Sequence, residues 1–173
     1  MTNNKTILML RHGKSDWGAS YSSDHERPLA PRGERAARRI GSWLSRIDRA
    51  PDLVLTSDAV RARTTVELAA QAGGWECPIE LRPEFYSGYQ GTIIEALQGL
   101  DESVRTVVLA GHQPTWSYAT AQLTGGGTLR FPTAALACLG HYGAWSTVAP
   151  GHCELRWLVT PKLLARGGAR PLA

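Results

Sequence analysis

The sequence predicts an α/β fold of three layers, in which a mostly parallel sheet lies between two layers of helices. Short, continuously apolar runs alternate along the chain with segments whose apolar residues recur at helical spacing. Glycine, proline and other turn residues separate these segments. Alternation of this kind is typical of parallel sheets whose strands are buried on both faces. We therefore expect a three-layer α/β/α sandwich with a mostly parallel central sheet.

Length and composition predict one domain. The chain has 173 residues, of which 43% are hydrophobic and 20% charged, as in ordinary globular proteins. We expect residues 1–173 to form a single domain with a core over about residues 5–163 and short loose termini. The three cysteines are widely spaced, which favours reduced thiols over a disulfide scaffold. No apolar run approaches the roughly 20 residues of a membrane span, and no signal-peptide cleavage site is evident, so we expect a cytoplasmic protein.

The first elements follow from an apolar run and a helical repeat. Residues 6–10 (TILML) form a short apolar run shortly before Gly13, which predicts a fully buried strand. The polar stretch of residues 15–27 predicts a loop. From Pro31 onward, apolar residues recur at helical spacing with arginines mostly on the opposite side. This pattern predicts an amphipathic helix that is stopped by Pro51.

A second strand and a second helix follow. Residues 53–55 predict another buried strand. Ser57 is a favourable N-cap for a helix over about residues 59–72, which should end at the glycines 73–74. A third, short strand is expected at residues 77–81.

The rest of the chain alternates once more and then becomes β-rich. A loop that contains Glu84 leads to helical spacing over residues 92–100, and an apolar run predicts a strand at residues 106–110. Pro114 suits the first turn of a helix that reaches Leu123. Gly-rich turns separate three further predicted strands: residues 134–139, 145–148 and 155–159.

Polar residues directly follow three of the predicted strands. Arg11 and His12 come after the first strand, Arg61 follows the second within a few residues, and His112 follows the strand at residues 106–110. In open parallel sheets, ligands bind beyond the carboxyl ends of the strands. We therefore expect these four side chains to converge in one crevice.

Two guanidinium and two imidazole groups suit a phosphoryl group. Arginine presents a fork that matches phosphate oxygens, and the helix after Ser57 adds backbone N–H groups. Neighbouring cations disfavour protonation of His12, so a ring nitrogen can attack phosphorus and carry the phosphoryl group until water releases it. The arginines stabilise the charge on the transferring oxygens. These steps need neither a metal nor another cofactor.

The same residues carry a resemblance to a known family. Three segments resemble, in order, the three motifs of the histidine phosphatase superfamily, whose fold is phosphoglycerate mutase-like: Arg11-His12-Gly13, Ser57 to Thr64, and Gly111-His112. Other segments resemble its small phosphohistidine phosphatase branch, which is SixA-like: Arg27-Pro28-Leu29 with Gly33, Phe131 to Ala135, and Leu155-Arg156-Trp157. The resemblance extends over about residues 5–163.

The resemblance implies a role for each motif residue. His12 would accept the phosphoryl group, and the phosphate would be bound by Arg11, Arg61 and His112. Gly13 would let the backbone approach the anion closely.

Two further residues are candidates for the same site. Ser15 could add a hydrogen bond to the phosphate. In the wider superfamily a carboxylic acid often protonates the leaving group, and Glu84 lies in the comparable loop. An ordinary surface carboxylate is the alternative interpretation of Glu84, because a phosphoramidate substrate has a basic leaving nitrogen and needs no strong acid.

The remaining patterns indicate no other chemistry. The net charge is +4, and the arginine-rich helix face is interpreted as solvated rather than as a nucleic-acid surface. The histidines lack the spacing of a metal site, and the glycines 125–127 lack the lysine of a nucleotide-binding loop. We expect no metal, no cofactor, no nucleic-acid partner and no membrane partner.

Three functional hypotheses remain open. The leading one is a phosphatase that works through a phosphohistidine intermediate on His12, with a phosphorylated protein, as phosphohistidine, or a small phosphorylated metabolite as substrate. The second is a module that binds a phosphorylated ligand without turnover. A mutase ranks lowest, because the short chain leaves little room for the substrate-gripping insertion of superfamily mutases.

Overall fold

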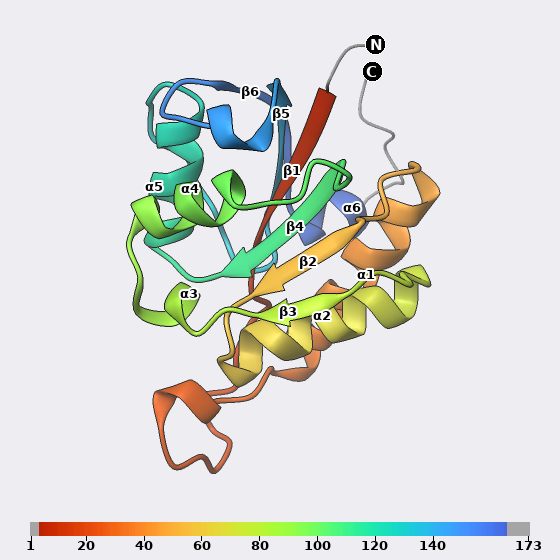
Figure 1. Ribbon diagram of the computed structural model, residues 1–173. Coiled ribbons are helices and arrows are strands. Elements are labelled where there is room, and N and C mark those ends of the chain that lie inside the picture. Colours follow the sequence, from red (N-terminus) through yellow and green to blue (C-terminus); the bar gives the residue numbers. More distant parts are fainter. Residues whose placement is uncertain (1–3, 166–173) are drawn as a thin grey trace.

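The computed structural model describes residues 4–165, which contain one six-stranded sheet with helices on both faces (Figure 1). The strands are β1 (Asn4–Arg11), β2 (Leu53–Thr56), β3 (Ile79–Leu81), β4 (Thr106–Gly111), β5 (Leu136–Tyr142) and β6 (Cys153–Val159). They lie in the order β3-β2-β4-β1-β5-β6. The first four strands are parallel, whereas β5 is antiparallel to both of its neighbours. The predicted α/β/α sandwich with a mostly parallel sheet is confirmed.

Two apolar clusters fill the spaces between the three layers. One face of the sheet is covered by α1 (Pro31–Arg46), α2 (Val60–Gly73) and α6 (Pro161–Ala165). The other face is covered by α3 (Glu84–Ser87), α4 (Gln90–Gln98), α5 (Thr115–Leu123) and the 3-10 helix η2 (Trp145–Thr147). Because strand side chains alternate, Ile7 and Met9 enter one cluster while Leu8 and Leu10 enter the other.

The prediction of a strand at residues 145–148 is wrong. This segment is held in place by the Trp145 side chain and not by hydrogen bonds to a neighbouring strand. The Trp145 ring is buried and its Nε1 donates to the Val104 carbonyl at 3.0 Å. The Trp145 amide donates to the Glu102 carboxylate at 2.7 Å. These contacts fix a single turn of 3-10 helix in place of extended backbone.

Three short helical segments were not predicted: two lie in expected loops, and the third lies after the last predicted strand. The loop of residues 15–27 contains the 3-10 helix η1 (Asp24–Glu26), and the loop with Glu84 contains α3. Pro161 begins α6, which packs Leu164 against the sheet. The predicted loose termini, residues 1–3 and the segment beyond 165, lie outside the described residues.

The register of the parallel strands places three strand ends at one edge of the sheet. Arg11 of β1 lies opposite Gly111 of β4, and Thr56 of β2 lies opposite Ala110. The residues that follow these strands therefore begin at the same edge. In Figure 1 the loop of residues 15–27 projects below this edge.

The N-terminal turn of α1 packs closely against the loop after β1. A Cβ atom added to Gly33 would lie 2.2 Å from the Lys14 carbonyl oxygen. The contact is possible only because glycine has no Cβ atom, since real Cβ atoms essentially never approach another atom so closely. Helix α1 therefore supports the backbone that follows His12 and Gly13.

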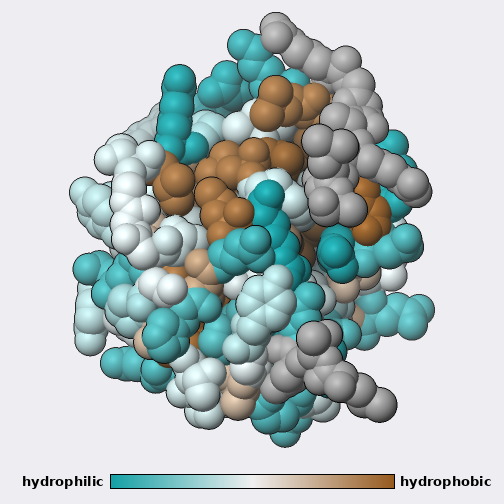
Figure 2. Space-filling view, turned by 90° about the horizontal axis from the view of Figure 1, so that it is seen from above, coloured by the Kyte–Doolittle hydropathy of each residue, from teal (hydrophilic) through white to brown (hydrophobic). Residues whose placement is uncertain are grey.

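The end of the molecule opposite to these strand ends has a surface of both polar and apolar side chains. Seen from above in Figure 2, hydrophilic side chains surround a group of apolar ones. Within residues 4–165, no helix combines the length and the apolar character that crossing a membrane requires.

Candidate active site

A cavity of about 350 Å³ lies at the edge where β1, β2 and β4 end. Its walls combine cationic, imidazole and neutral side chains from the end of β1 and the loop after it, from the start of α2, and from the loops before and after α5. The lining residues are Arg11, His12, Lys14, Ser15, Trp17, Arg27, Arg61, His112, Gln113 and Thr133. The structure therefore brings the four residues expected to converge, together with Ser15, into one cavity.

One hydrogen bond determines the protonation pattern of His12. Its Nδ1 lies 2.7 Å from the Gly13 carbonyl oxygen, which can only accept, so the proton of the neutral ring is on Nδ1. The pKa of His12 is lowered to about 4. Burial is the main cause, the Gly13 bond acts in the opposite direction, and the nearby arginine cations (Arg61, Arg11, Arg27) also lower the pKa. The ring is therefore neutral near pH 7, and Nε2 keeps its lone pair.

His112 faces His12 across the cavity. The two ring centroids are 5.1 Å apart, with the planes tilted by 52°. Its Nε2 lies 2.9 Å from the Ser57 hydroxyl, the residue that follows β2, and burial lowers its pKa to about 3. Among the described residues, its buried Nδ1 has no hydrogen-bond partner. Buried polar atoms of this kind usually have a partner, which a bound anion would supply.

The two predicted arginines are held by backbone carbonyls and still have unused donors. Arg11 donates to the Phe131 carbonyl at 2.9 Å, and Arg61 donates to the Asp24 carbonyl at 2.6 Å. The Nε atoms of both arginines are buried without a partner in the described part of the chain. Each guanidinium is thus fixed in place with at least one donor left for a ligand.

A third arginine and an aspartate complete the site, and the sequence did not identify either as a site residue. The Asp24 carboxylate accepts from Arg27 at 2.7 Å and from Arg61 at 2.9 Å. The bond from Arg27 is the main reason why the pKa of Asp24 is lowered, so the carboxylate stays ionised. Arg27 also donates to the Ser15 hydroxyl and stacks on Trp17, 3.8 Å from the ring centroid. The only sequence signal for Arg27 was the family resemblance of its segment.

Gly13 and Ser15 occupy the loop after β1. The Gly13 amide donates to the Thr65 hydroxyl at 3.0 Å, so it is fixed by helix α2. Ser15 is buried in the cavity wall, where its hydroxyl accepts from Arg27. The hydroxyl proton of Ser15 remains available for a ligand.

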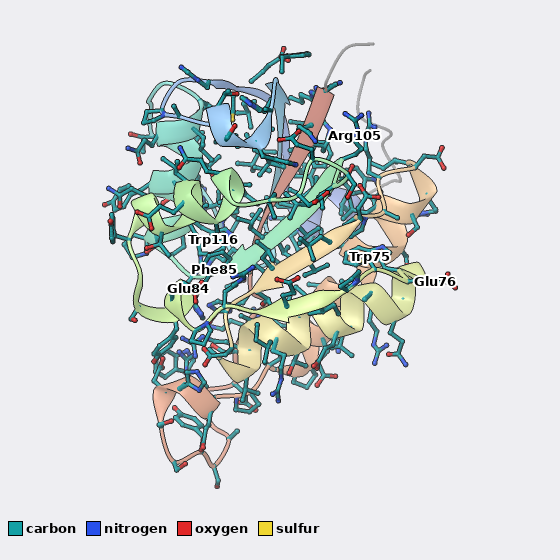
Figure 3. The ribbon with its side chains drawn as sticks, in the orientation of Figure 1. Trp75, Glu76, Glu84, Phe85, Arg105 and Trp116 are labelled. Carbon is teal, nitrogen blue, oxygen red and sulfur yellow. The ribbon has the colours of Figure 1, made fainter. Side chains whose placement is uncertain are left out.

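Glu84 does not line this cavity. It begins α3, its side chain is about half exposed, and its nearest cation is Arg82, at 3.9 Å. In Figure 3, Glu84 lies at the surface of α3 while Phe85 points inward toward Trp116. The α3 residue that reaches the site is Tyr86, whose hydroxyl donates to Asp24 at 3.2 Å and whose ring packs edge-on against His112.

The other histidines, His25, His141 and His152, lie outside the cavity lining. His141 is buried between the Ala144 carbonyl and the His152 carbonyl, both at 3.1 Å. His25 pairs with Asp58 at 2.9 Å and packs against Tyr86. It therefore contacts the site residue Tyr86 without lining the cavity itself.

Comparison with known proteins agrees with this geometry. The family model described as histidine phosphatase superfamily (branch 1) matches residues 7–87. An uncharacterized protein of Mycobacterium tuberculosis is 34% identical over 163 residues, which cover 88% of this chain and 100% of the relative. Phosphohistidine phosphatase SixA of Escherichia coli is 31% identical over 134 residues, 76% of this chain and 82% of the relative.

Solved structures give the same result. A protein histidine phosphatase SixA complexed with tungstate superposes with a TM-score of 0.81 at 28% identity, over 92% of this chain and 99% of that one. A structure assigned as phosphohistidine phosphatase SixA from Nakamurella multipartitia also gives 0.81 at 28% identity, over 91% and 96%.

Proposed function

The chain belongs to the histidine phosphatase superfamily and is a phosphatase, and from that premise we propose that it hydrolyses its substrate through a phosphoryl group carried on His12. The observation that carries the proposal is the His12 Nδ1 bond to Gly13, which leaves Nε2 with a free lone pair in a cavity lined by three arginines. A neutral imidazole nitrogen at such a position is a nucleophile for phosphorus.

The reaction has two displacement steps. Nε2 of His12 attacks phosphorus, a P–N bond forms, and the leaving group departs with the electron pair of its bond to phosphorus. Water then attacks phosphorus, the P–N bond breaks with its electron pair returning to Nε2, and inorganic phosphate leaves with the free ring regenerated. Arg11 and Arg61 stabilise the charge on the phosphoryl oxygens in both steps. His112 and Ser15 supply further hydrogen bonds.

We propose phosphohistidine on a protein as the substrate. The ten lining residues are cations, imidazoles and neutral side chains, and the neighbouring Asp24 is kept ionised by Arg27 and Arg61. Such a site suits a phosphoramidate, because the leaving imidazole nitrogen is basic and takes up a proton readily. The likeness to the SixA phosphohistidine phosphatases supports the same choice. We assign no proton transfer to Glu84.

The test is phosphate release and protein labelling in matched histidine variants. Wild type should release phosphate from p-nitrophenyl phosphate and from a phosphohistidine peptide, and should be labelled transiently by a radioactive phosphoryl donor. His12→Ala should lose both activity and label, whereas His152→Ala, at an exposed histidine, should keep them. Hydrolysis that survives His12→Ala would refute the nucleophile assignment.

Two further outcomes would contradict phosphatase chemistry of this type. Tight binding of a phosphorylated ligand by the wild type without phosphate release would favour the binding module. Strong inhibition by a chelator would indicate a metal-dependent reaction instead. We expect turnover that a chelator leaves unchanged.

A further inference from the structure

A second, larger cavity lies beside the catalytic one and shares a wall with it. Its volume is about 560 Å³, within the range of small-molecule sites. Lys14 and Thr133 line both cavities. A single bound molecule can therefore occupy the catalytic cavity with one group and the second cavity with another.

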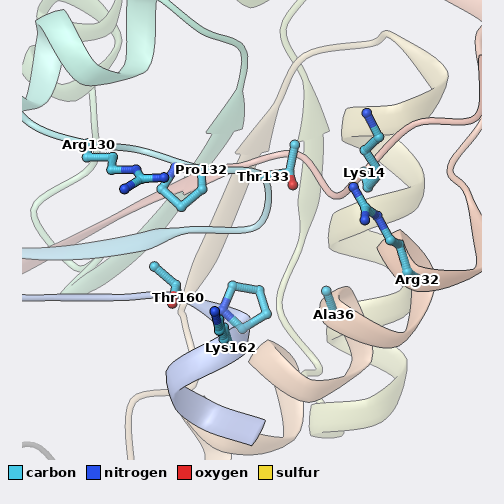
Figure 4. A pocket seen from close by; sticks show the side chains of 9 residues that line it. Lys14, Arg32, Ala36, Arg130, Pro132, Thr133, Thr160 and Lys162 are labelled. Atoms are coloured by element: carbon cyan, nitrogen blue, oxygen red, sulfur yellow. The ribbon is translucent and has the colours of Figure 1, made fainter.

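The second cavity is lined by four cations and by neutral residues only. Figure 4 shows Arg130 and Lys162 on one side of the opening, with Lys14 and Arg32 on the other. The neutral lining residues are an alanine, two prolines and two threonines: Ala36, Pro132, Pro161, Thr133 and Thr160. Four like charges around one hollow create a strongly positive potential, which attracts anions.

None of these four cationic groups makes a side-chain hydrogen bond or ion pair within residues 4–165. By contrast, Arg27 and Arg61 each bind Asp24, and Arg63 on the surface of α2 pairs with Glu67 at 3.6 Å. Residues 4–165 thus supply no side-chain partner for the cations of the second cavity. An external anion would supply the missing partner.

Three of the four cations, Lys14, Arg32 and Arg130, lie in backbone segments that hold or support the phosphate site, whereas Lys162 lies in α6. Arg130 directly precedes Phe131, whose carbonyl accepts the hydrogen bond from Arg11. Arg32 lies in the first turn of α1, next to Gly33, which packs on the Lys14 backbone. Their distance from the catalytic cavity is therefore set by well-packed structure, as a specificity site requires.

We propose that the second cavity binds a second anionic group of the substrate, a carboxylate or a phosphate on the same molecule as the transferred phosphoryl group. This inference rests on the proposed function. It makes the preferred substrate a phosphorylated molecule with at least two separated acidic groups. In a phosphoprotein the second group is an acidic side chain near the phosphohistidine, and in a metabolite it is a second phosphate.

The experiment compares substrates with and without the second anion in a double variant, Arg130→Gln/Lys162→Gln. The probes are p-nitrophenyl phosphate, phosphohistidine peptides with two flanking aspartates or two flanking asparagines, and alkyl chains with one or two terminal phosphates. We expect wild type to have a lower KM for the probe with the second anion. The double variant should raise that KM about fivefold or more, with kcat nearly unchanged.

A matched control removes the same charge at the far end of the molecule. In Arg49→Gln/Arg105→Gln the substituted arginines are exposed beside the amino ends of β2 and β4, and Arg105 lies far from the Glu84 end in Figure 3. This control should keep the wild-type preference for probes with the second anion. Both double variants lose two positive charges, so a loss of long-range attraction would affect them similarly, and only a local binding site distinguishes them. The probe class whose KM responds, peptide or alkyl bisphosphate, identifies the source of the second anion.

Two results would overturn the inference. One is a wild type that shows no preference for the second anion in either probe class. The other is a double variant that loses activity equally on all probes, including p-nitrophenyl phosphate. Failure of the proposed function is distinct, since it would appear as His12-independent turnover, or no turnover, of p-nitrophenyl phosphate by wild type.

Discussion

Single residues set the chemistry of this site through bonds to the backbone. The Gly13 carbonyl selects the His12 tautomer, the Phe131 carbonyl orients Arg11, and the Asp24 carbonyl orients Arg61. Backbone acceptors hold His12 and Arg11, whereas Arg61 is also bound by the Asp24 carboxylate. The catalytic geometry therefore exists before a phosphoryl group enters, which lowers the cost of reorganisation during the reaction.

Replacing Arg61 should reduce activity far more than replacing its neighbour on the same helix. Arg61→Gln should lower kcat/KM on p-nitrophenyl phosphate by about a hundredfold or more, because it removes one donor to the transition state. Arg63→Gln is the control, since Arg63 is exposed and pairs with Glu67 on the surface of α2. Similar rates for the two variants would show that Arg61 does not bind the transferred phosphoryl group.

The buried histidines should make the folded state less stable in acid. The pKa of His12 is lowered to about 4 and that of His112 to about 3, both below the ordinary value of 6.5. As the pH falls below 6.5, the unfolded chain takes up two protons that the folded chain refuses, so the free energy of unfolding decreases toward pH 4.

Urea denaturation at several pH values checks this expectation. Between pH 6.5 and 4, His12→Gln should reduce the pH dependence by up to about 1.4 kcal/mol per pH unit. His152→Gln, at an exposed position, is the control and should leave it unchanged. An identical pH dependence in wild type and His12→Gln would mean that His12 is protonated in the folded protein as readily as in the unfolded chain.

Among single residues, the sequence predicted the site residues that follow strands and missed those that reach the site from loops. Arg11, His12 and His112 could be located because each directly follows an apolar run. Asp24 and Tyr86 reach the site only through the conformation of η1 and α3. Loop conformation depends on tertiary packing, so local sequence pattern does not reveal it.

Among the elements, the prediction succeeded where the local pattern is strong. Strands β1, β2 and β4 were predicted from continuous apolar runs, helix α1 from its helical spacing, and helix α2 from Ser57 and the glycines at its end. It failed at residues 145–148, where Trp145 is buried as an anchor and not as part of a strand face. A segment this short does not show enough of a repeat to distinguish a strand from a buried aromatic anchor in a turn.

The contact between α1 and the loop after β1 should be sensitive to a single methyl group. In Gly33→Ala the new Cβ would lie 2.2 Å from the Lys14 carbonyl oxygen and 2.8 Å from its amide nitrogen. The loop must shift, which should cost about 1–3 kcal/mol of stability and lower kcat.

Gly18→Ala is the control for this change, because the nearest atom to its Cβ would be Asp16 Oδ1 at 3.5 Å, an ordinary contact. Urea denaturation and turnover of p-nitrophenyl phosphate measure the two effects. Wild-type stability and rate in Gly33→Ala would show that α1 does not support the catalytic loop.

For the whole molecule, positive charge gathers around the catalytic end and should attract anionic substrates. The net charge is +4, and both cavities are lined by cations. Raising NaCl from about 20 mM to about 500 mM should lower kcat/KM about threefold or more by screening this attraction. The measurement is initial rates on p-nitrophenyl phosphate, with sucrose as a control for viscosity. Rates independent of salt would contradict electrostatic steering.

The central position of β1 has a consequence for how the protein is made. This strand pairs with β4 on one side and β5 on the other, so Thr6 lies beside Thr106 and Leu10 beside Leu136. A nascent chain cannot close the sheet around β1 until its later strands have left the ribosome, and such distant pairings form slowly. The segment that bears His12 is thus synthesised early and assembled late, so a truncated translation product has no working phosphate pocket.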